Sequence, residues 1–350
     1  MESKIPVAIL GATGAVGQRF VQVLADHPWF EIAGLAASER SAGRPYGEAC
    51  HSILPGDVPE WIREMPVLPL EPGIPGKIVF SALPADVARE VEPRFAAAGY
   101  AVCSNASAFR YAPDVPLIIP EVNPDHLALI PGQREGRGTP GFIVTNPNCS
   151  TSGIAMALKP LDDAFGVETV LAFTMQAVSG AGYPGVPSLD IIGNVLPYIP
   201  GEEEKIAREA RLLLGTVRDG AQVPADFQLS AHANRVPVID GHTICLSVAL
   251  NGHPGPAAVR EALREFRAPD AVAGLPSAPS RPLALRDEDD RPQPRRDCGA
   301  AAGMAVSVGR VRACEVFDVR MVVLVHNTLR GAAGGAVLNG ELLVAQGYVS

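Results

Sequence analysis

The 350-residue sequence predicts an α/β fold in which a doubly wound parallel sheet is followed by a second domain of the α+β class. In the first half, short apolar runs alternate with amphipathic stretches, an order typical of parallel strands connected by helices. After about residue 149 the apolar runs lengthen and become strand-rich, and two clear helices interrupt them. Hydrophobic residues make up 47% of the chain and charged residues 19%, as in packed globular proteins.

The elements of the first half follow from this alternation. Glycine and proline punctuate the apolar runs, which are short enough to be buried strands. The strands are expected at residues 5–10, 31–37, 77–83, 100–104 and 141–146, and the helices at 14–25 and 85–98. Residues 38–76 show no clear periodicity and are expected to be a loop.

The second half mixes longer strands with helices, which indicates an antiparallel or mixed sheet. Its strands are expected at residues 169–178, 230–238, 242–250 and 316–326, and its helices at 202–214 and 257–266. The Ala/Gly-rich tail, 327–348, is helical by pattern. Residues 269–299 are expected to be a loop, either an ordered excursion or oligomer contact, or a flexible segment.

Charge and cysteine usage exclude several classes of protein. The net charge of -9 and the lack of a basic patch argue against nucleic-acid or anionic-membrane binding. No apolar run approaches the roughly 18 residues that span a bilayer, and the start, MESKIPVAILG, lacks a signal peptide's apolar core. The six cysteines lie far apart without a CxxC pair, so we expect reduced thiols in a cytoplasm and no metal site.

The stretch GATGAVG, residues 11–17, lies between the first predicted strand and the first helix. This is the context of the glycine-rich dinucleotide fingerprint, so the first domain is predicted to be Rossmann-like. Glycines there allow a pyrophosphate to approach the helix N-terminus, although they also serve plain turns. The expected cofactor contacts in this stretch are Gly11, Thr13, Gly14, Ala15 and Val16.

The end of the second predicted strand bears on the choice of nucleotide. An NAD site usually places an acidic residue there, where this chain has Ser38. Arg40 and Ser41 are suited to a 2′-phosphate, whereas Glu39 keeps NAD open, so NADP is the preferred cofactor. Ser81, in the predicted strand 77–83, completes the expected contacts in this domain.

A lone cysteine, Cys149, lies in TNPNCSTSGIAMALKPL, residues 145–161. The preceding Asn-Pro-Asn signals a turn, and the following Ser-Thr-Ser favours a helix N-terminus. A thiol in that position faces unpaired N–H groups and the positive end of the helix dipole, which predicts a stabilised thiolate. The alternative is a structural cysteine that packs as a small apolar residue.

A nicotinamide domain followed by such a cysteine indicates thiol-assisted aldehyde chemistry, which needs a nearby base. Among seven histidines His242 stands out, because Asp240-Gly241 predicts a tight turn between two strands. Arg235 and His242 would then flank one hairpin and face one pocket. The alternative is a solvated hairpin end.

Several motifs follow the order found in aspartate-semialdehyde dehydrogenases, and the chain resembles the archaeal and fungal branch of that family over its whole length. The motifs are GATGAVGQ, ASERSAG, SNASAFR, NPNCSTS, SGAGYPG, GEEEKI, NRVPVIDGHT, RPQPRRD and HNTLRGAAGG. The resemblance implies a reversible NADP-dependent reaction of L-aspartate 4-semialdehyde and phosphate to 4-phospho-L-aspartate. In cells this reaction runs in the reducing direction, towards lysine, methionine and threonine.

The resemblance also implies roles for single residues. Cys149 matches the nucleophile that forms a thioester, and His242 the general acid/base. Arg235 matches the residue that binds the substrate α-carboxylate, and Arg110, assisted by Lys205, the phosphate-binding arginine.

The resemblance implies roles for seven further residues. Glu202 would bind the substrate ammonium, although Glu203 is a rival and an acidic helix start is stabilising in its own right. Gln176 would orient the acyl intermediate and Asn148 would support the thiol. The nicotinamide pocket would be lined by Ser179, Gly180, Gly182 and Asn327.

The resemblance implies that residues 1–149 plus 328–350 form the NADP-binding domain, and that 150–327 form the catalytic and dimerisation domain of a dimer or tetramer. Other functions remain open at this stage. They are a malonyl-CoA reductase on the same scaffold, an N-acetylglutamyl-phosphate reductase, a thiol hydrolase, and a noncatalytic nucleotide or redox sensor.

Overall fold

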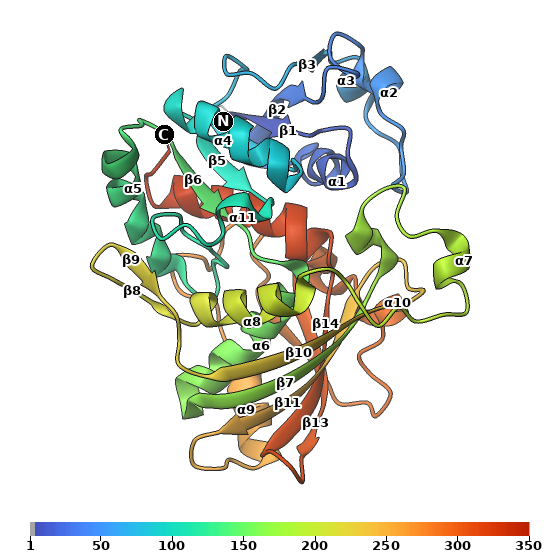
Figure 1. The fold of residues 1–350 in the computed structure, drawn as a ribbon, viewed down its shortest axis with the longest axis vertical. Helices are drawn as coiled ribbons and strands as arrows, with labels where there is room; N and C mark the ends of the chain where they lie inside the picture. Colours follow the sequence, from blue (N-terminus) through green and yellow to red (C-terminus); the bar gives the residue numbers. More distant parts are fainter. Residues whose placement is uncertain (1–3, 350) are drawn as a thin grey trace.

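The computed structural model describes residues 4–349, which form two layered bodies, each built on a six-stranded sheet (Figure 1). The first sheet is parallel, with the strand order β3-β2-β1-β4-β5-β6. Its strands are β1 (Ile5–Leu10), β2 (Phe30–Ala36), β3 (Val67–Leu68), β4 (Ile78–Ser81), β5 (Ala101–Ser104) and β6 (Phe142–Thr145). This order confirms the doubly wound, Rossmann-like prediction, with the chain reversing direction across the sheet between β1 and β4.

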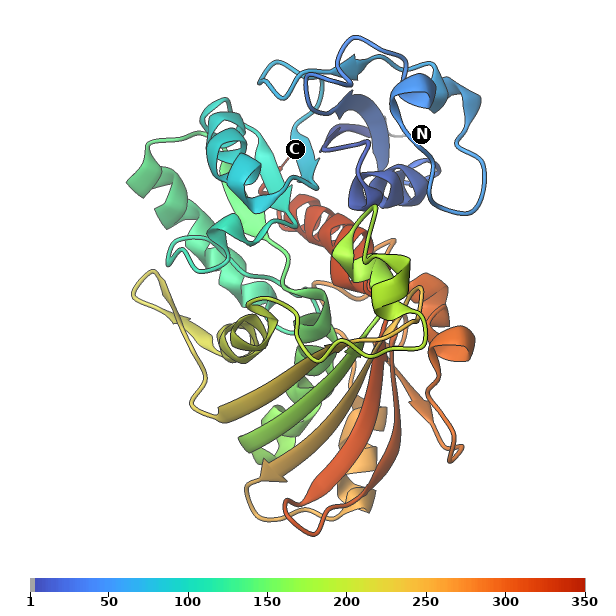
Figure 2. The same cartoon turned by 45° about the vertical axis from the view of Figure 1, so that its right-hand side comes forward.

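Helices cover both faces of this sheet. They are α1 (Ala15–Leu24), α4 (Ala85–Ala97), α5 (Leu129–Arg137) and α11 (Gly334–Ala345), the last preceded by the π-helical turn η5 (Leu329–Ala333). Phe80 of β4 packs with Phe20 of α1 and Val337 of α11, whereas its neighbour Val79 packs with Phe95 of α4. Helix α11, red in Figures 1 and 2, therefore belongs to the first sheet although it comes from the other end of the chain.

The segment 38–76, expected to be a loop, is partly regular. It contains α2 (Tyr46–Ala49), α3 (Glu60–Arg63) and β3, which extends the sheet beyond β2. The hydroxyl of Tyr46 donates a hydrogen bond to the carbonyl of Ala12 at 3.1 Å, which fixes this segment beside the glycine-rich loop. These elements are two to four residues long, too short for a periodic pattern.

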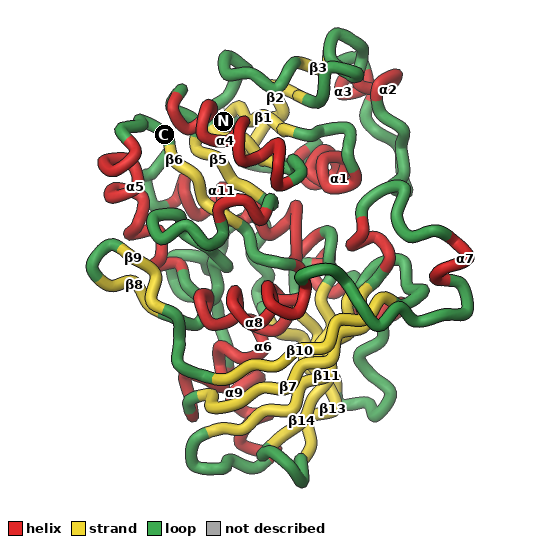
Figure 3. The backbone as a smooth tube through the Cα atoms, in the orientation of Figure 1, coloured by secondary structure: helices red, strands yellow, loops and turns green. Residues whose placement is uncertain are grey.

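The second sheet is mixed, with the order β10-β7-β11-β14-β13-β12. Its strands are β7 (Val167–Gln176), β10 (Gln228–Arg235), β11 (His242–Leu250), β12 (Leu283–Arg286), β13 (Val306–Ala313) and β14 (Val319–Val325). Helices α6 (Cys149–Phe165), α8 (Glu202–Leu213) and α9 (Pro256–Glu265) pack on one face, and Figure 3 shows strands β10, β7 and β11 in front of α6 and α9. Along β11, Ile244 and Leu246 are buried in this helix-covered core, while Thr243 and Cys245 are half-buried.

The predicted hairpin around Asp240-Gly241 is wrong. Strand β10 pairs in parallel with β7, and β11 pairs antiparallel with the other side of β7, so β7 separates the two. The turn belongs to a connection that passes the end of β7, where the Val236 N–H still bonds the carbonyl of Gln176 at 3.0 Å. The end of β10, the end of β7 and the start of β11 nevertheless meet at one edge of the sheet.

Residues 269–299 form the ordered excursion that was one of the expected alternatives. The segment contains β12, which pairs with β13, and the turn α10 (Pro294–Asp297). The buried Asp297 carboxylate accepts hydrogen bonds from the Arg291 side chain and from the Gln293 backbone N–H at 2.7 Å each. Strand β13 and the small hairpin of β8 (Thr216–Arg218) and β9 (Ala221–Val223) were not predicted. Within residues 4–349, no helix combines the length and apolarity needed to cross a bilayer.

Candidate active site

Cys149 is the first residue of α6. Asn148 caps this helix, because its side-chain oxygen accepts the backbone N–H groups of Ser150 at 2.9 Å and Thr151 at 3.1 Å. The sulfur of Cys149 lies 3.1 Å from Nε2 of His242. The helix start predicted from the sequence is therefore confirmed, and it places the thiol against a histidine from the second sheet.

His242 is the first residue of β11 and is fully buried. Its Nδ1 accepts the backbone N–H of Ala177 at 3.0 Å, so a neutral ring carries its proton on Nε2, facing the sulfur. Burial, with smaller contributions from Arg235 and His326, lowers the pKa of His242 to about 3. The ring is thus a neutral imidazole around neutral pH.

The prediction that the helix N-terminus stabilises a thiolate is wrong for this environment. Burial raises the pKa of Cys149 to about 12, and the negative charge of Glu202 raises it further. Arg110, Arg235 and the Ser150 N–H act in the opposite direction but do not compensate for the lost hydration. The resting pair is therefore a neutral thiol beside a neutral imidazole.

Three other predicted site residues form a cluster next to the thiol. Glu202, at the start of α8, is buried, and its Oε1 accepts hydrogen bonds from the Asn148 side chain at 2.8 Å and from Gln176 at 2.9 Å. Glu203 instead accepts the backbone N–H of Ala233 in β10 at 2.9 Å. Of the two rivals for the ammonium site, Glu202 is therefore the one that lies beside Asn148 and Gln176.

The end of β10 brings Arg235 to the same place. Its guanidinium donates to the carbonyl of Ala177 at 2.9 Å. A Cβ on Gly180 would lie 2.9 Å from this guanidinium and 3.1 Å from the His242 ring, so only glycine leaves both groups in position. Arg235 and His242 thus both lie against Gly180, although β7 lies between their strands.

The expected nicotinamide-binding residues also lie together. Ser179 and Gly180 lie in the turn η3 (Val178–Ala181), and Gly182 follows it. The amide of Asn327 donates to the Ser179 hydroxyl at 2.8 Å and accepts the Gly241 N–H at 2.9 Å. This side chain joins the turn after β7 to the start of β11.

Arg110 lies directly after the short turn η1 (Ser107–Phe109) and is buried. It donates to Glu209 at 3.0 Å and to the carbonyl of Asn105 at 2.7 Å, while its buried Nε–H has no hydrogen-bond partner among residues 4–349. Lys205 is half-buried on α8, and no ion pair joins it to another described residue. The structure thus leaves the buried Nε–H of Arg110 without a partner among residues 4–349.

Sequence reasoning missed Glu209. This carboxylate is fully buried and accepts hydrogen bonds from Arg110, from the hydroxyl of Tyr111 and from the backbone N–H of Asn148. It lies two helical turns after Glu202 on α8, and this i, i+7 spacing was the signal that could have placed it on the same helix face.

The glycine-rich loop has the shape that a pyrophosphate requires. A Cβ on Gly17 would overlap the carbonyl oxygen of Gly11, and one on Gly11, whose φ is +78°, would lie 2.9 Å from the Ala82 carbonyl. Gly14 precedes the first turn of α1, which begins with Ala15 and Val16, and Thr13 lies in the loop just before. The loop therefore presents the N-terminus of α1 without side chains in the way, which fits a bound dinucleotide.

The other predicted contacts of this domain lie at the same edge of the sheet. Ser38 and Arg40 are exposed just after β2, whereas Ser41 is buried. Ser81 is buried at the end of β4, the strand next to β1. An exposed guanidinium beside the strand end suits a 2′-phosphate.

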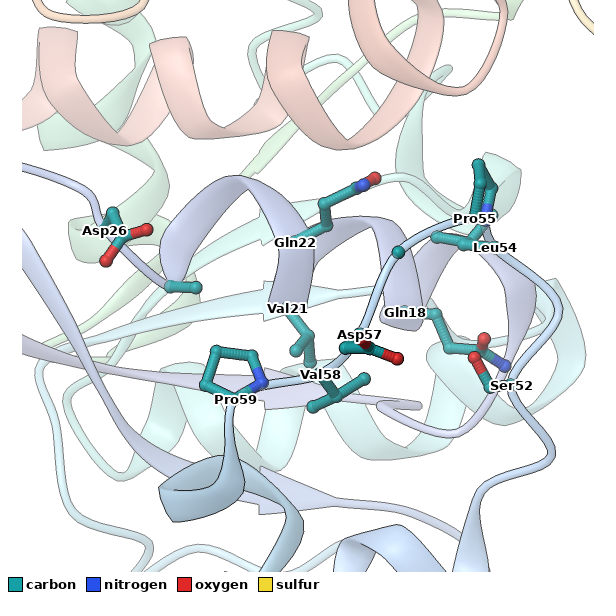
Figure 4. Close-up of a pocket in the computed structure, with 12 residues that line it drawn as sticks. Gln18, Val21, Gln22, Asp26, Ser52, Leu54, Pro55, Asp57, Val58 and Pro59 are labelled. Carbon is teal, nitrogen blue, oxygen red and sulfur yellow. The ribbon is translucent and has the colours of Figure 1, made fainter.

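A cavity of about 590 Å³ lies between the two bodies, and residues of both line it. They include Ala15 and Arg19 of α1 together with Ser179, Gly182 and Tyr183. A smaller cavity of about 230 Å³ lies between α1 and residues 52–59, and its lining includes Gln18, Val21 and Gln22 of α1 as well as Val58 and Pro59 (Figure 4). None of the predicted site residues lines the smaller cavity.

Two family models match the chain. Residues 6–130 match the model of the semialdehyde dehydrogenase NAD-binding domain, and residues 158–330 that of the semialdehyde dehydrogenase dimerisation domain. The aspartate-semialdehyde dehydrogenase of Methanothermobacter thermautotrophicus is 53% identical, covering 97% of this chain and 99% of the relative. That of Cryptococcus neoformans is 47% identical, covering 99% of this chain and 98% of the relative.

A solved structure shows the same fold. The aspartate semialdehyde dehydrogenase of Candida albicans, crystallised with NADP, matches with a TM-score of 0.91 and 42% identity, over 99% of this chain and 100% of that one. These relatives support the aspartate-semialdehyde interpretation and not the malonyl-CoA alternative. The chain belongs to the aspartate-semialdehyde dehydrogenase family.

Proposed function

We propose that the protein catalyses the reversible, NADP-dependent conversion of L-aspartate 4-semialdehyde and phosphate to 4-phospho-L-aspartate, the step that serves lysine, methionine and threonine biosynthesis. The observation that carries the proposal is the 3.1 Å contact between the Cys149 sulfur and His242 Nε2 at the N-terminus of α6. The charges of Arg110 and Arg235 act on this thiol, which suits a substrate with a carboxylate and a phosphate partner.

In the oxidative direction the Cys149 sulfur adds to the aldehyde carbon and forms a thiohemiacetal. NADP, when bound at the glycine-rich loop, supplies the hydride acceptor that allows this adduct to become a thioester. A phosphate oxygen then attacks the thioester carbon, which releases the thiol and yields the acyl phosphate. The thiol proton passes to the aldehyde oxygen as the adduct forms, and the adduct loses this proton as the hydride leaves. His242, whose Nε2 faces the sulfur, is assigned to these proton exchanges.

The two charged groups on the substrate's α-carbon are assigned to side chains of opposite charge. Arg235 binds the α-carboxylate as a planar fork, and Glu202 binds the α-ammonium. Gln176 and Asn148 hold the Glu202 carboxylate and orient the acyl group beside the sulfur. The free Nε–H of Arg110 is available to phosphate, with Lys205 as a second cation.

The cofactor contacts proposed for this chain follow the same pattern. The pyrophosphate would lie at the N-terminus of α1, the 2′-phosphate beside Arg40 and Ser41, and the carboxamide near Asn327. We assign residues 1–149 and 328–350 to the NADP domain and 150–327 to the catalytic domain; residues 1–3 and 350 lie outside the described residues.

We also propose that copies of the chain associate through the uncovered face of the second sheet. Phe173 of β7 is 44% exposed there and stacks on His232 of β10, with 4.8 Å between ring centres. The match to a dimerisation domain supports this assignment, and sedimentation velocity would test it.

All six cysteines are free thiols, in keeping with the cytoplasmic location that stays a prediction.

Substitution of the nucleophile tests the proposed function. Cys149→Ala is expected to abolish turnover, because no other group forms the thioester, while NADPH affinity measured by fluorescence stays near that of the parent. A variant that retains turnover would refute the thioester role. Loss of both turnover and NADPH binding would mark Cys149 as structural.

A further inference from the structure

The buried Glu209 carboxylate joins two parts of the active site that otherwise belong to different segments of the chain. Its Oε1 accepts Arg110 at 3.0 Å and the Tyr111 hydroxyl at 3.2 Å, and its Oε2 accepts the backbone N–H of Asn148 at 2.6 Å. Arg110 is the guanidinium assigned to phosphate, and Asn148 caps the helix that begins with Cys149. One side chain therefore fixes both groups.

Helix α8 holds Asn148 through two carboxylates. Glu202 accepts the side-chain amide of Asn148 and Glu209 accepts its backbone N–H, while the Asn148 Oδ1 caps α6. The backbone N–H and the side-chain amide of Asn148 thus both donate to carboxylates of α8, which sets the position of the helix that carries Cys149. Because a buried carboxylate without partners is costly, this arrangement resists displacement.

The same carboxylate determines how Arg110 meets an anion. Glu209 engages Nη1 and the Asn105 carbonyl engages Nη2, which leaves the buried Nε–H without a partner among residues 4–349. The guanidinium is therefore held by two fixed acceptors, while its Nε–H has no partner among residues 4–349. Loss of Glu209 would free the guanidinium to rotate and leave a buried positive charge unpaired.

We propose that Glu209 is a positioning residue that holds the phosphate-binding guanidinium of Arg110 and the Cys149 end of α6 in one fixed arrangement. The inference rests on the proposed function, because it gives the anion at Arg110 the role of attacking phosphate. Glu209 does not touch the substrate; it acts through Arg110 and Asn148.

The test compares Glu209→Gln and Glu209→Asp with Glu204→Gln, an exposed position on the same helix. In Glu209→Gln the side-chain NH₂ group replaces one carboxylate oxygen, so it would face an N–H or O–H donor and one side of the Glu209 contacts would be lost. The KM for phosphate is therefore expected to rise at least about tenfold. The KM for aspartate semialdehyde should stay within about twofold, a split that general unfolding would not produce. Glu209→Asp keeps the charge and should fall between, and Glu204→Gln should match the parent.

A double-mutant cycle separates positioning from a general structural role. In an Arg110→Ala background, Glu209→Gln should add little to the phosphate KM, because the group that it acts through is gone. Independent, multiplicative effects would overturn the proposal, as would an unchanged phosphate KM in folded Glu209→Gln. If Glu209→Gln does not fold, an unchanged phosphate KM in Glu209→Asp overturns it.

A second readout needs no substrate and keeps the two proposals distinguishable. The rate of Cys149 alkylation by iodoacetamide should change at least about threefold in Glu209→Gln, because the N-terminus of α6 loses an anchor. If the parent enzyme shows no phosphate dependence, the proposed function fails and the alkylation rate alone decides on Glu209. An unchanged rate then overturns the positioning role as well.

Discussion

At the scale of single residues, the thiol and the imidazole of the resting site are both neutral. The pKa of Cys149 is raised to about 12, mainly by burial, and that of His242 is lowered to about 3 by the same cause. Reactivity therefore has to come from the small thiolate fraction, or from charges that arrive with the substrate. This differs from cysteines whose thiolate is stabilised by a helix N-terminus alone.

The first prediction concerns the pH dependence of Cys149 alkylation. Since the thiolate is the reactive form and its fraction grows as pH rises towards the raised pKa, the alkylation rate should climb about tenfold per pH unit from pH 6 to 9 without a plateau. Mass spectrometry of the Cys149 peptide after timed iodoacetamide treatment gives the rate. A plateau below pH 8 would mean that the thiolate is stabilised after all.

Glu202 supplies a matched variant for this measurement. Its charge raises the pKa of Cys149, so Glu202→Gln should speed alkylation at pH 8 by about threefold or more. The exposed Glu204→Gln on the same helix is the control. A rate in Glu202→Gln at or below that of the control would show that the carboxylate does not act on the sulfur.

At the scale of elements, the glycine-rich loop depends on a contact that the sequence motif only implied. Gly17→Ala should weaken NADP binding at least about tenfold, because its Cβ would overlap the Gly11 carbonyl and push the loop away from the start of α1. Gly132→Ala in α5 is the control, since a Cβ there meets no atom within 4 Å. Calorimetric titration with NADP distinguishes the two, and equal affinities would contradict the close-packing argument.

Helix α4 carries a buried carboxyl whose proton is linked to folding. Burial raises the pKa of Glu92 to about 7, while the hydrogen bond from Ser104 and the charge of Arg110 act in the opposite direction. Between about pH 4.5 and 7 the folded protein keeps a proton that the unfolded chain has lost. The contribution of Glu92 to stability should therefore fall by about 3 kcal/mol as the pH rises through this window.

Glu92→Gln tests this linkage, because an amide has no proton to lose. The free energy of unfolding of the variant minus that of the parent should be more positive at pH 8 than at pH 5. Urea unfolding at both pH values measures it. The exposed Glu90→Gln on the same helix should leave the pH dependence as it is in the parent. A stability difference between Glu92→Gln and the parent that is the same at pH 5 and pH 8 would contradict the account.

Local pattern predicted most of the long elements, but it missed the short ones and the eight-residue strand β13. Strands β1 and β11 and helices α4 and α8 have the apolar periodicity and end signals that define such elements, and they lie within a residue or two of their predicted bounds. The two-residue strand β3 is too short to show a period. The Asp-Gly turn resembles a hairpin signal in sequence, and only the pairing of both flanking strands with β7 excludes one.

At the scale of the whole molecule, the site forms where the two sheets approach each other. Cys149 follows β6 of the first sheet at the start of a helix that packs on the second, and α11 returns from the second sheet to cover the first. Arg19 of α1 donates to Thr328 at 3.1 Å and pairs with Asp240 at 3.5 Å, which links the bodies beside the larger cavity. A cofactor on one body can thus meet a thioester between them.

The family resemblance predicted which residues of the second sheet belong to the site, and the fold explains why they lie together. Motif order predicted which side chains matter, and the shared edge of β10, β7 and β11 explains why Arg235, Gln176 and His242 meet. Sequence could not assign Glu209, because its partners Arg110 and Asn148 come from distant segments of the chain. The raised pKa of Cys149 likewise depends on burial, which no local motif records.

The most direct test of the proposed reaction is the formation of NADPH by the purified protein from NADP⁺ and L-aspartate semialdehyde, followed at 340 nm with and without phosphate. The account predicts steady NADPH formation that requires phosphate, because phosphate must release the acyl group from Cys149. Without phosphate, at most about one equivalent of NADPH per active site should form. Absence of NADPH formation, or a steady rate that is the same without phosphate, would contradict the proposed reaction.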